Sequence, residues 1–349
     1  MELLKEVKHN IADLDRVSME KAQQRLDNLT KPPGSLGVLE KLCVQLAGIY
    51  KNPMPSIDKK TVVVMAGDHG VVEEGVSAFP QEVTPQMVVN FLKGGAAINV
   101  LCRHAGASIK CVDIGVCQDI KHPQLIVKKV KHGTQNMVKG PAMSRTEAEK
   151  TIEIGIQTAI TEIEVGADIL ATGEMGIGNT TPSSAILACY TDEPVEVITG
   201  RGTGLNDEKL KQKIQVIKKA LSLNKPAPED PIDVLSKVGG FEIGGLAGLI
   251  LGAAYKRKPV VIDGFISSAA ALIAAKIQPK AVNYMIPSHL SEEPGHKIAL
   301  KVLGLKPMLR MNMRLGEGTG AALAFNLIEA AVKIIKEMAT FDEAGVSKG

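Results

Sequence analysis

The 349 residues include five cysteines but no CxxC spacing. This pattern argues against a zinc site or a disulfide framework and favours a reducing compartment. No apolar run reaches the about 20 residues that a membrane-spanning helix needs. The charges are nearly balanced, with 41 basic and 38 acidic side chains and no long run of either sign. We therefore expect neither a nucleic-acid partner nor a membrane partner.

The first residues, MELLKEVKHN, lack the apolar core of a signal peptide. Together with the cysteine pattern, this predicts a cytoplasmic protein. The most apolar stretch is Gly244–Tyr255, in which Gly248 and Gly252 have the spacing of close helix contacts. It indicates either a buried helix or one half of a subunit contact.

The chain is long for a single hydrophobic core, so we expect a large domain and a smaller one. Residues 1–55 are predicted to supply N-terminal helices, one capped at Ser18 in SMEKAQQRLDNL and another in GVLEKLCVQLAGIY, with TKPPGSLG as the loop between them. Residues 56–318 are predicted to form a large α/β catalytic domain. Residues 319–349 carry a helix with a broad apolar face, which is expected to join the N-terminal helices in the small domain.

Short apolar runs from residue 61 onward predict the fold class. They are TVVVMAGDHG, SIKCVDIGV, DILATGEMG, VEVITGRGTG, PVVIDGFIS, AVNYMIPSH and MLRMNMRLGEGTG. Continuous rather than alternating apolar residues are typical of strands buried on both faces. Most of the runs are followed by a helical stretch, so they predict a doubly wound, Rossmann-like parallel sheet flanked by helices.

A polar residue directly follows each of several of these runs. In open parallel sheets, ligands bind outside the carboxyl ends of the strands, where helix N-termini also point. We therefore expect the following residues to converge on one crevice: Asp68, Glu174, Arg201, Asp263, Ser288 and Glu317.

Three glycine-rich turns are each expected to join a strand to a helix: Gly173–Thr181, Gly200–Gly204 and Gly316–Gly320. Such turns offer backbone N–H groups to a phosphate, although none has the full P-loop or GxGxxG pattern. The helix after the second turn is expected to be capped at Asn206 or Asp207. Its Lys213 is either a surface residue or a phosphate contact.

Other residues leave two interpretations open. The loop Gly67–Met87 is either a plain connection or part of a substrate pocket, and it has no HExxH or GxSxG motif. Glu174 and Glu317 lie in similar glycine-rich settings. They fit acid–base work in a crevice, and they fit equally well as acceptors of hydrogen bonds from neighbouring loops.

Long motifs in a fixed order give the sequence a more specific resemblance. They are KPPGSLG, AGDHGVVEEGVSAFPQEVT, GEMGIGNTT, TGRGTGL, DGFISSAAAL, SHLSEEPGH and MRLGEGTGAALA. With them the chain resembles the nicotinate-nucleotide:dimethylbenzimidazole phosphoribosyltransferases, from about residue 20 to about residue 340. The resemblance implies transfer of 5-phosphoribose from nicotinate mononucleotide to 5,6-dimethylbenzimidazole, giving α-ribazole 5′-phosphate and nicotinate. It also implies a homodimer whose small helical domain comes from both chain ends.

The resemblance also implies roles for individual residues. Glu317 would be the general base, and Glu174 would lie beside the ribose. The phosphoribosyl group would be held by Gly176, Asn179, Gly202, Gly204, Lys213, Gly264 and Ser291. The acceptor base would be bound by Ser77, Phe79, Gln86 and Leu315.

Elementary chemistry is consistent with these roles. Nicotinate leaves as a neutral ring nitrogen and needs no general acid, whereas the attacking base gains positive charge unless a carboxylate takes its N–H proton. No pyrophosphate leaves, so no metal or other cofactor is expected. With no tryptophan and only 3% aromatic residues, the pocket for a flat base must be mostly aliphatic.

Alternative functions stay open. The acceptor could be adenine, another benzimidazole or a phenol, since a pocket contact shifts such a preference by only a few kcal/mol. A pyrophosphate-dependent phosphoribosyltransferase would need magnesium and a paired-acid motif that is absent beside VITGRGTG. A nucleotide-binding regulator or an inactive partner subunit is the alternative from another class.

Overall fold

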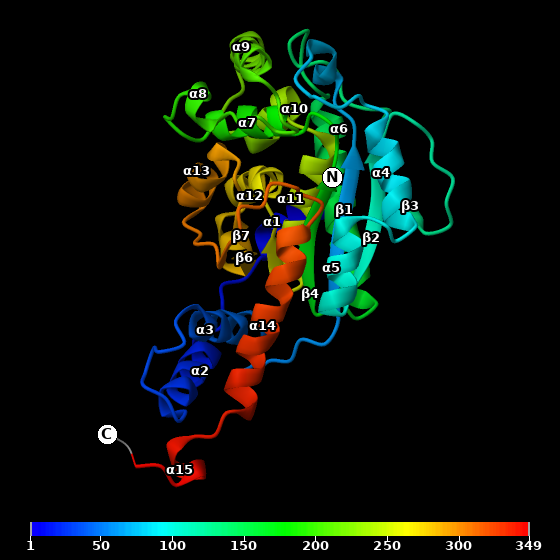
Figure 1. The fold of residues 1–349 in the computed structure, drawn as a ribbon. Coiled ribbons are helices and arrows are strands. Elements are labelled where there is room, and N and C mark those ends of the chain that lie inside the picture. Colours follow the sequence, from blue (N-terminus) through cyan, green and yellow to red (C-terminus); the bar gives the residue numbers. More distant parts are fainter. Residues whose placement is uncertain (1, 348–349) are drawn as a thin grey trace.

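A computed structural model describes residues 2–347 and has one central parallel sheet (Figure 1). Its strand order is β3-β2-β1-β4-β5-β6. The strands are β1 (Lys60–Gly67), β2 (Ala107–Gly115), β3 (Leu125–Val127), β4 (Ile169–Met175), β5 (Val260–Ile262) and β6 (Met285–Pro287). The chain adds strands on one side of β1 and then returns to the other, so the order reverses between β1 and β4. This confirms the predicted doubly wound α/β class.

The strands are apolar at consecutive positions because both faces of the sheet are covered. In β1, Val63 and Met65 belong to one hydrophobic cluster, whereas Val62, Val64 and Ala66 belong to the cluster on the opposite face. Side chains alternate between the faces of a strand, so a sheet between two helical layers has no polar face.

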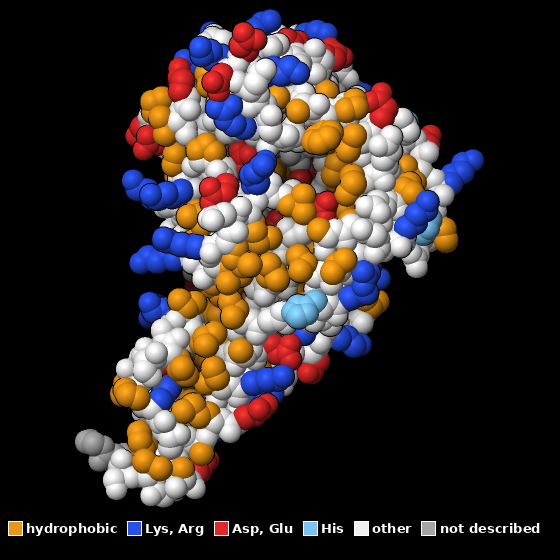
Figure 2. All heavy atoms as spheres, viewed as in Figure 1, with side chains coloured by type: hydrophobic (Ala, Val, Ile, Leu, Met, Phe, Trp, Pro, Cys, Tyr) orange, Lys and Arg blue, Asp and Glu red, His pale blue; other side chains and the backbone are white. Residues whose placement is uncertain are grey.

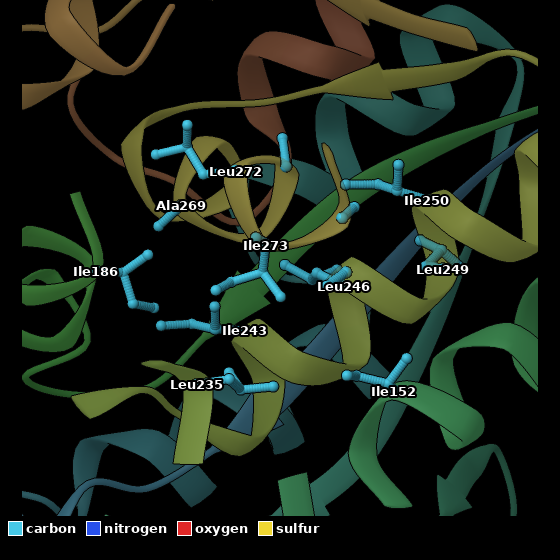
Figure 3. Close-up of a cluster of buried hydrophobic side chains, with 14 of the residues drawn as sticks. Ile152, Ile186, Leu235, Ile243, Leu246, Leu249, Ile250, Ala269, Leu272 and Ile273 are labelled. Carbon is cyan, nitrogen blue, oxygen red and sulfur yellow. The ribbon is translucent and has the colours of Figure 1, made fainter. Parts of the chain in front are cut away.

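The first helical layer contains the most apolar segment of the chain. Its helices are α1 (Glu2–Asn10), α6 (Arg145–Glu164), α7 (Thr180–Ala188), α9 (Asp207–Asn224), α10 (Pro231–Val238), α11 (Phe241–Tyr255), α12 (Phe265–Ile277) and α13 (Pro294–Leu303). Figure 3 shows side chains of α6, α7, α10, α11 and α12 meeting in its core.

The glycine spacing in α11 makes a contact within the chain. A Cβ added at Gly248 would lie 1.9 Å from the backbone oxygen of Ile152 in α6, and one at Gly252 would lie 2.8 Å from the oxygen of Ile156. Of the two interpretations of this stretch, the buried helix is therefore the one that the structure bears out.

The second layer joins the two ends of the sequence. It consists of α2 (Arg16–Asn28), α3 (Val38–Tyr50), α4 (Val83–Leu92), α5 (Ala97–Ala105) and α14 (Thr319–Glu337), followed by α15 (Phe341–Ala344). Helix α14 packs against α2, α3 and α5. Figure 1 shows α2, α3 and the C-terminal half of α14 extending beyond the sheet. Helix α1 packs instead against α6 and α11. The division at residues 55 and 318 stays a prediction.

One expected strand is wrong, and another lies outside the main sheet. The run VEVITG forms the short helix α8 (Val195–Ile198), which starts after Pro194, because a short apolar run does not by itself distinguish helix from strand. The run MLRMNM contributes only β8 (Leu309–Arg310), which pairs with β7 (His289–Leu290) outside the main sheet. Strand β3 was not predicted at all.

The cap of α2 is also corrected. Asp15, rather than Ser18, caps the helix, and its carboxylate accepts the backbone N–H of Ser18 at 2.8 Å. The 3-10 helices η1 (Gly70–Glu74) and η2 (Pro279–Tyr284) complete the fold. Within residues 2–347, no helix is both long and apolar enough to cross a membrane.

Candidate active site

A cleft of about 460 Å³ opens at the carboxyl ends of β4 and β5, beside the point where the strand order reverses. Figure 2 shows acidic atoms set back in a hollow on this face. The lining residues lie within six stretches, not every residue of which faces the cleft: Val76–Met87, Glu174–Thr180, Gly202–Thr203, Asp263–Ser267, His289–Glu293 and Arg314–Glu317. Ligands bind at this position in doubly wound sheets.

Glu174, near the end of β4, has a carboxyl group whose pKa lies near neutral pH. Its side chain is buried, the amide of Asn179 donates to Oε2, and the backbone N–H of Glu317 donates to Oε1 at 3.1 Å. Burial raises the pKa of Glu174 to about 7, against the opposing effect of the two hydrogen bonds. This group can therefore exist in either protonation state at physiological pH.

Glu317 lines the same cleft and has an unusual backbone conformation. Its φ is 63°, between Gly316 at 86° and Gly318 at 96°. A left-handed conformation costs a non-glycine residue about 1–2 kcal/mol, and such strain persists only where the surroundings fix it. Oε2 accepts the backbone N–H of Ile98 at the start of α5, at 3.3 Å. Burial raises the pKa of Glu317, and that hydrogen bond partly offsets the rise.

Asp263 fixes the loop that carries Glu317. Its buried carboxylate accepts the backbone N–H of Gly318 at 3.2 Å and that of Ala321 at 3.0 Å. It thus caps the first turn of α14 from another part of the chain, because Gly318 at the N-cap has no side chain. Burial raises the pKa of Asp263, while His289 and these N–H groups act in the opposite direction.

The other end of the cleft has the features of an anion site. Lys213 is buried, and its Nζ donates to Thr180 Oγ1 at 2.7 Å and to the Gly200 oxygen at 3.1 Å. Burial lowers the pKa of Lys213 to about 8, against the charge of Glu293. Thr180 is the first residue of α7, so a helix N-terminus and a lysine meet here.

Most residues singled out from the sequence meet at this cleft. It is lined by Glu174, Glu317, Gly176, Asn179, Gly202, Gly264, Ser291, Ser77, Phe79 and Leu315. Lys213 lies immediately behind Thr180 and Gly202. Among the described residues, Gly204 and Gln86 are exposed and do not contribute to the lining, which on α4 comes from Val83 and Met87.

The expected convergence of polar residues is partly correct. Asp263 lines the cleft with the two glutamates, whereas the described lining does not include Asp68, Arg201 or Ser288. Arg201 is exposed and pairs with Asp207 at 2.5 Å, because the segment before it is a helix and not a strand of the sheet. Asn206 caps α9, as one of the two expectations had it.

Some residues of the site were missed. Thr203 Oγ1 accepts the backbone N–H of Ala78 at 3.0 Å and so joins the GRGTG turn to the loop around Ser77. His289 and Glu293 lie within the motif SHLSEEPGH, which was their only sequence signal.

A buried ion pair under the site was missed as well. His69 Nε2 and Glu242 Oε1 are 2.7 Å apart, and a Cβ at Gly176 would lie 3.1 Å from the same ring nitrogen. Burial acts to lower the pKa of His69, but the charge and hydrogen bond of Glu242 raise it overall. Glu242 lies in the otherwise apolar helix α11, where no local pattern announces it. Within residues 2–347, no group of three or more His, Cys, Asp or Glu side chains could hold a metal ion.

The arrangement thus combines two buried carboxyl groups, a lysine with a helix N-terminus, and an apolar wall that includes Val83, Met87 and Leu315. It can bind a phosphorylated sugar at one end and a flat apolar ring at the other. A carboxylate between them can accept a proton from the ring.

Comparison with known proteins agrees with this arrangement. A family model described as phosphoribosyltransferase matches residues 11–346. A nicotinate-nucleotide–dimethylbenzimidazole phosphoribosyltransferase of Desulforamulus reducens is 59% identical over 351 residues, covering 100% of both chains. The protein of the same name from Chloroflexus aggregans is 57% identical, over 100% of this chain and 99% of its own.

Solved structures give the same result. The crystal structure of CobT from Thermus thermophilus is similar with a TM-score of 0.92 and 45% identity, covering 95% of this chain and 100% of its own. A second structure from that organism, described as a nicotinate-nucleotide-dimethylbenzimidazole phosphoribosyltransferase, has a TM-score of 0.91 and 44% identity over 96% of this chain and 100% of its own.

Proposed function

The chain belongs to the nicotinate-nucleotide–dimethylbenzimidazole phosphoribosyltransferase family, and from this premise we propose that it transfers 5-phosphoribose from nicotinate mononucleotide to 5,6-dimethylbenzimidazole. The products are α-ribazole 5′-phosphate and nicotinate. The observation that carries the proposal is the placing of Glu317 and Glu174 in one cleft with an anion site at its far end.

In the proposed reaction, a ring nitrogen of dimethylbenzimidazole attacks the ribose carbon that bears nicotinate. The bond to nicotinate breaks, and its electron pair stays on the departing pyridine nitrogen. Glu317 accepts the proton of the other ring nitrogen, through the oxygen that does not bond Ile98. Removing this proton prevents positive charge from building up, which is typically worth about 10²–10⁴-fold in rate.

The geometry of attack supports an inverted product. The new bond forms on the face opposite the leaving group, so a β-linked substrate gives an α-linked product. Glu174, buried next to Glu317, would lie beside the ribose, where a carboxylate favours the positive charge that develops on the sugar.

Binding roles follow the two ends of the cleft. The phosphate would be held by Gly176, Asn179, Gly202, Lys213, Gly264 and Ser291. The acceptor base would be held by Ser77, Phe79 and Leu315, with Val83 and Met87 as aliphatic walls. This lining tolerates related flat bases, so adenine, another benzimidazole or a phenol is the second candidate acceptor.

The setting of the enzyme is part of the proposal. Family resemblance supports a homodimer, which sedimentation at several protein concentrations would test. The free thiols of all five cysteines, each within the described residues, support a reducing cytoplasm.

A metal-free assay tests the function. The protein is incubated with nicotinate mononucleotide and an equimolar mixture of candidate bases in the presence of a chelator, and the products are separated by chromatography. We expect nicotinate release with a dimethylbenzimidazole product in excess. No nicotinate release with any base would contradict the proposal, and a different main product would change the acceptor alone.

A further inference from the structure

Glu293 is an acidic side chain at the anion end of the cleft, where a negative group is not expected. It lines the cleft, is only 8% exposed, and has no hydrogen-bond partner for Oε2 among residues 2–347. Its position is fixed, because it is the N-cap of α13, is followed by Pro294, and donates its backbone N–H to Ser291 Oγ at 3.3 Å. A buried carboxyl oxygen without a partner is costly unless a ligand supplies one.

Glu293 and Lys213 lie on either side of the same piece of backbone. A Cβ added at Gly200 would be 1.9 Å from Oε2 of Glu293, and the Gly200 oxygen accepts Nζ of Lys213. The backbone N–H of Gly202 is also near enough to the Glu293 carboxyl to lower its pKa. Glu293 therefore shares the place where Lys213, Gly202 and the start of α7 come together.

The charged and titratable groups around Glu293 come from several elements. Lys213 of α9 and Arg314 are the cations that act on it. His296 of α13 accepts the backbone N–H of Ser291 on Nδ1, so its hydrogen is on Nε2, and burial with the nearby His289 lowers its pKa to about 3. His296 is thus neutral. Burial raises the pKa of Glu293, although Lys213, Gly202 and Arg314 partly offset the rise.

A phosphate that enters this place adds negative charge next to the carboxyl group. Like charges at close range disfavour the ionised carboxylate, while a neutral carboxylic acid can donate its O–H to a phosphate oxygen. We propose that Glu293 is a further phosphate-binding residue, which takes up one proton from solvent when the nucleotide binds and donates that hydrogen from Oε2 to a phosphate oxygen. This inference rests on the proposed function, because it takes the 5′-phosphate of nicotinate mononucleotide as the ligand.

The sign of the pH effect follows from linkage. Binding raises the pKa of Glu293, so the complex holds a proton that the free enzyme has lost. Affinity is therefore greatest at low pH and falls as pH rises, by up to about tenfold per pH unit for this one proton.

Calorimetry of nicotinate mononucleotide binding, between pH 6 and pH 8.5, tests the proposal. Heats measured in buffers with different ionisation enthalpies give the number of protons taken up. Wild-type protein should take up one proton on binding, and Glu293→Gln should not. The glutamine amide already carries N–H donors and does not titrate in this pH range. The dissociation constants of wild type and Glu293→Gln should converge at low pH, where Glu293 is protonated. At high pH the variant should bind nicotinate mononucleotide more tightly, because it has no carboxylate there. Glu292→Gln removes the exposed carboxyl one residue away and should match the wild type.

A measurement on wild-type protein alone covers the case in which Glu293→Gln does not fold. Infrared difference spectra should show the gain of a protonated carboxyl group on addition of nicotinate mononucleotide, and no such gain with nicotinate riboside, which lacks the phosphate. Absence of this signal would overturn the proposal.

The outcomes separate the two proposals. Equal proton uptake by wild type and Glu293→Gln, in a preparation that releases nicotinate, overturns only the role of Glu293. Failure of nicotinate mononucleotide to bind the wild type overturns the proposed function and this inference together.

Discussion

Replacing Asp263 by alanine removes the carboxylate that holds the first turn of α14 and the loop of Glu317. Two buried backbone N–H groups, of Gly318 and Ala321, lose their charged acceptor. Hydrogen bonds to charged groups are worth about 1.5–3 kcal/mol each, and removal of a buried carboxylate returns part of this as relieved desolvation. We expect a net loss of about 3 kcal/mol in the free energy of unfolding, which for a chain of this length lowers Tm by about 4 °C.

The same change should reduce turnover. The loop keeps Glu317 in a left-handed conformation only while its neighbours fix it, so loosening it misplaces the base. A displacement of about 1 Å can cost about 10²-fold in kcat. Differential scanning calorimetry and steady-state kinetics measure both effects. Asp263→Asn retains an oxygen acceptor and should lose less of each.

The control is Asp192→Ala, which removes an exposed carboxylate and should leave Tm and kcat unchanged. If Asp263→Ala has the Tm and kcat of the wild type, then the cap neither stabilises α14 nor positions Glu317, and the reasoning is refuted.

Three further outcomes follow from the contacts described. Lys213→Met should raise KM for nicotinate mononucleotide by about 10²-fold, with kcat much less changed, because a buried cation at the anion site is lost. The rise of kcat/KM with pH through about 7 should flatten in Glu174→Gln. Because the pKa of Glu174 is raised on folding, the stability that its proton contributes is complete below pH 4.5 and is lost as pH rises through about 7, so wild-type Tm should fall relative to the variant over that window. Gly248→Ala should lower the free energy of unfolding by about 3 kcal/mol, because its Cβ would lie 1.9 Å from the Ile152 oxygen. In the control Gly140→Ala, the added Cβ has nothing within 4 Å, so this variant should melt with the wild type. Equal melting temperatures of the two variants would contradict the helix contact.

The fold class could be predicted because its signal is local. Continuous apolar runs alternate with helices, and β1, β2, β4, β5 and β6 all arise from runs identified in the sequence. Short segments were the errors: Val195–Ile198 became a helix and Leu309–Arg310 joined a separate small sheet. In these two segments the apolar run does not by itself distinguish helix from strand or one sheet from another, so the neighbours in space decide the outcome.

The site could be predicted in part. Glycine-rich turns and family motifs identified Glu174 and Glu317, which the structure brings into one cleft. The partners that tune them come from distant segments, such as the N–H of Ile98 for Glu317 and the carboxylate of Asp263 for the loop. Contacts between residues more than fifty positions apart leave no periodic or spacing signal, so only the folded chain reveals them.

The most direct test of the proposed chemistry is the kinetics of Glu317→Gln. The variant keeps the shape of the side chain but cannot accept the ring proton, so kcat should fall by about 10²–10⁴-fold while the dissociation constant of nicotinate mononucleotide stays near the wild-type value. Glu292→Gln, at an exposed site, should turn over at the wild-type rate. Wild-type kcat in Glu317→Gln would contradict the account, because the proton of the incoming base would then leave by another route.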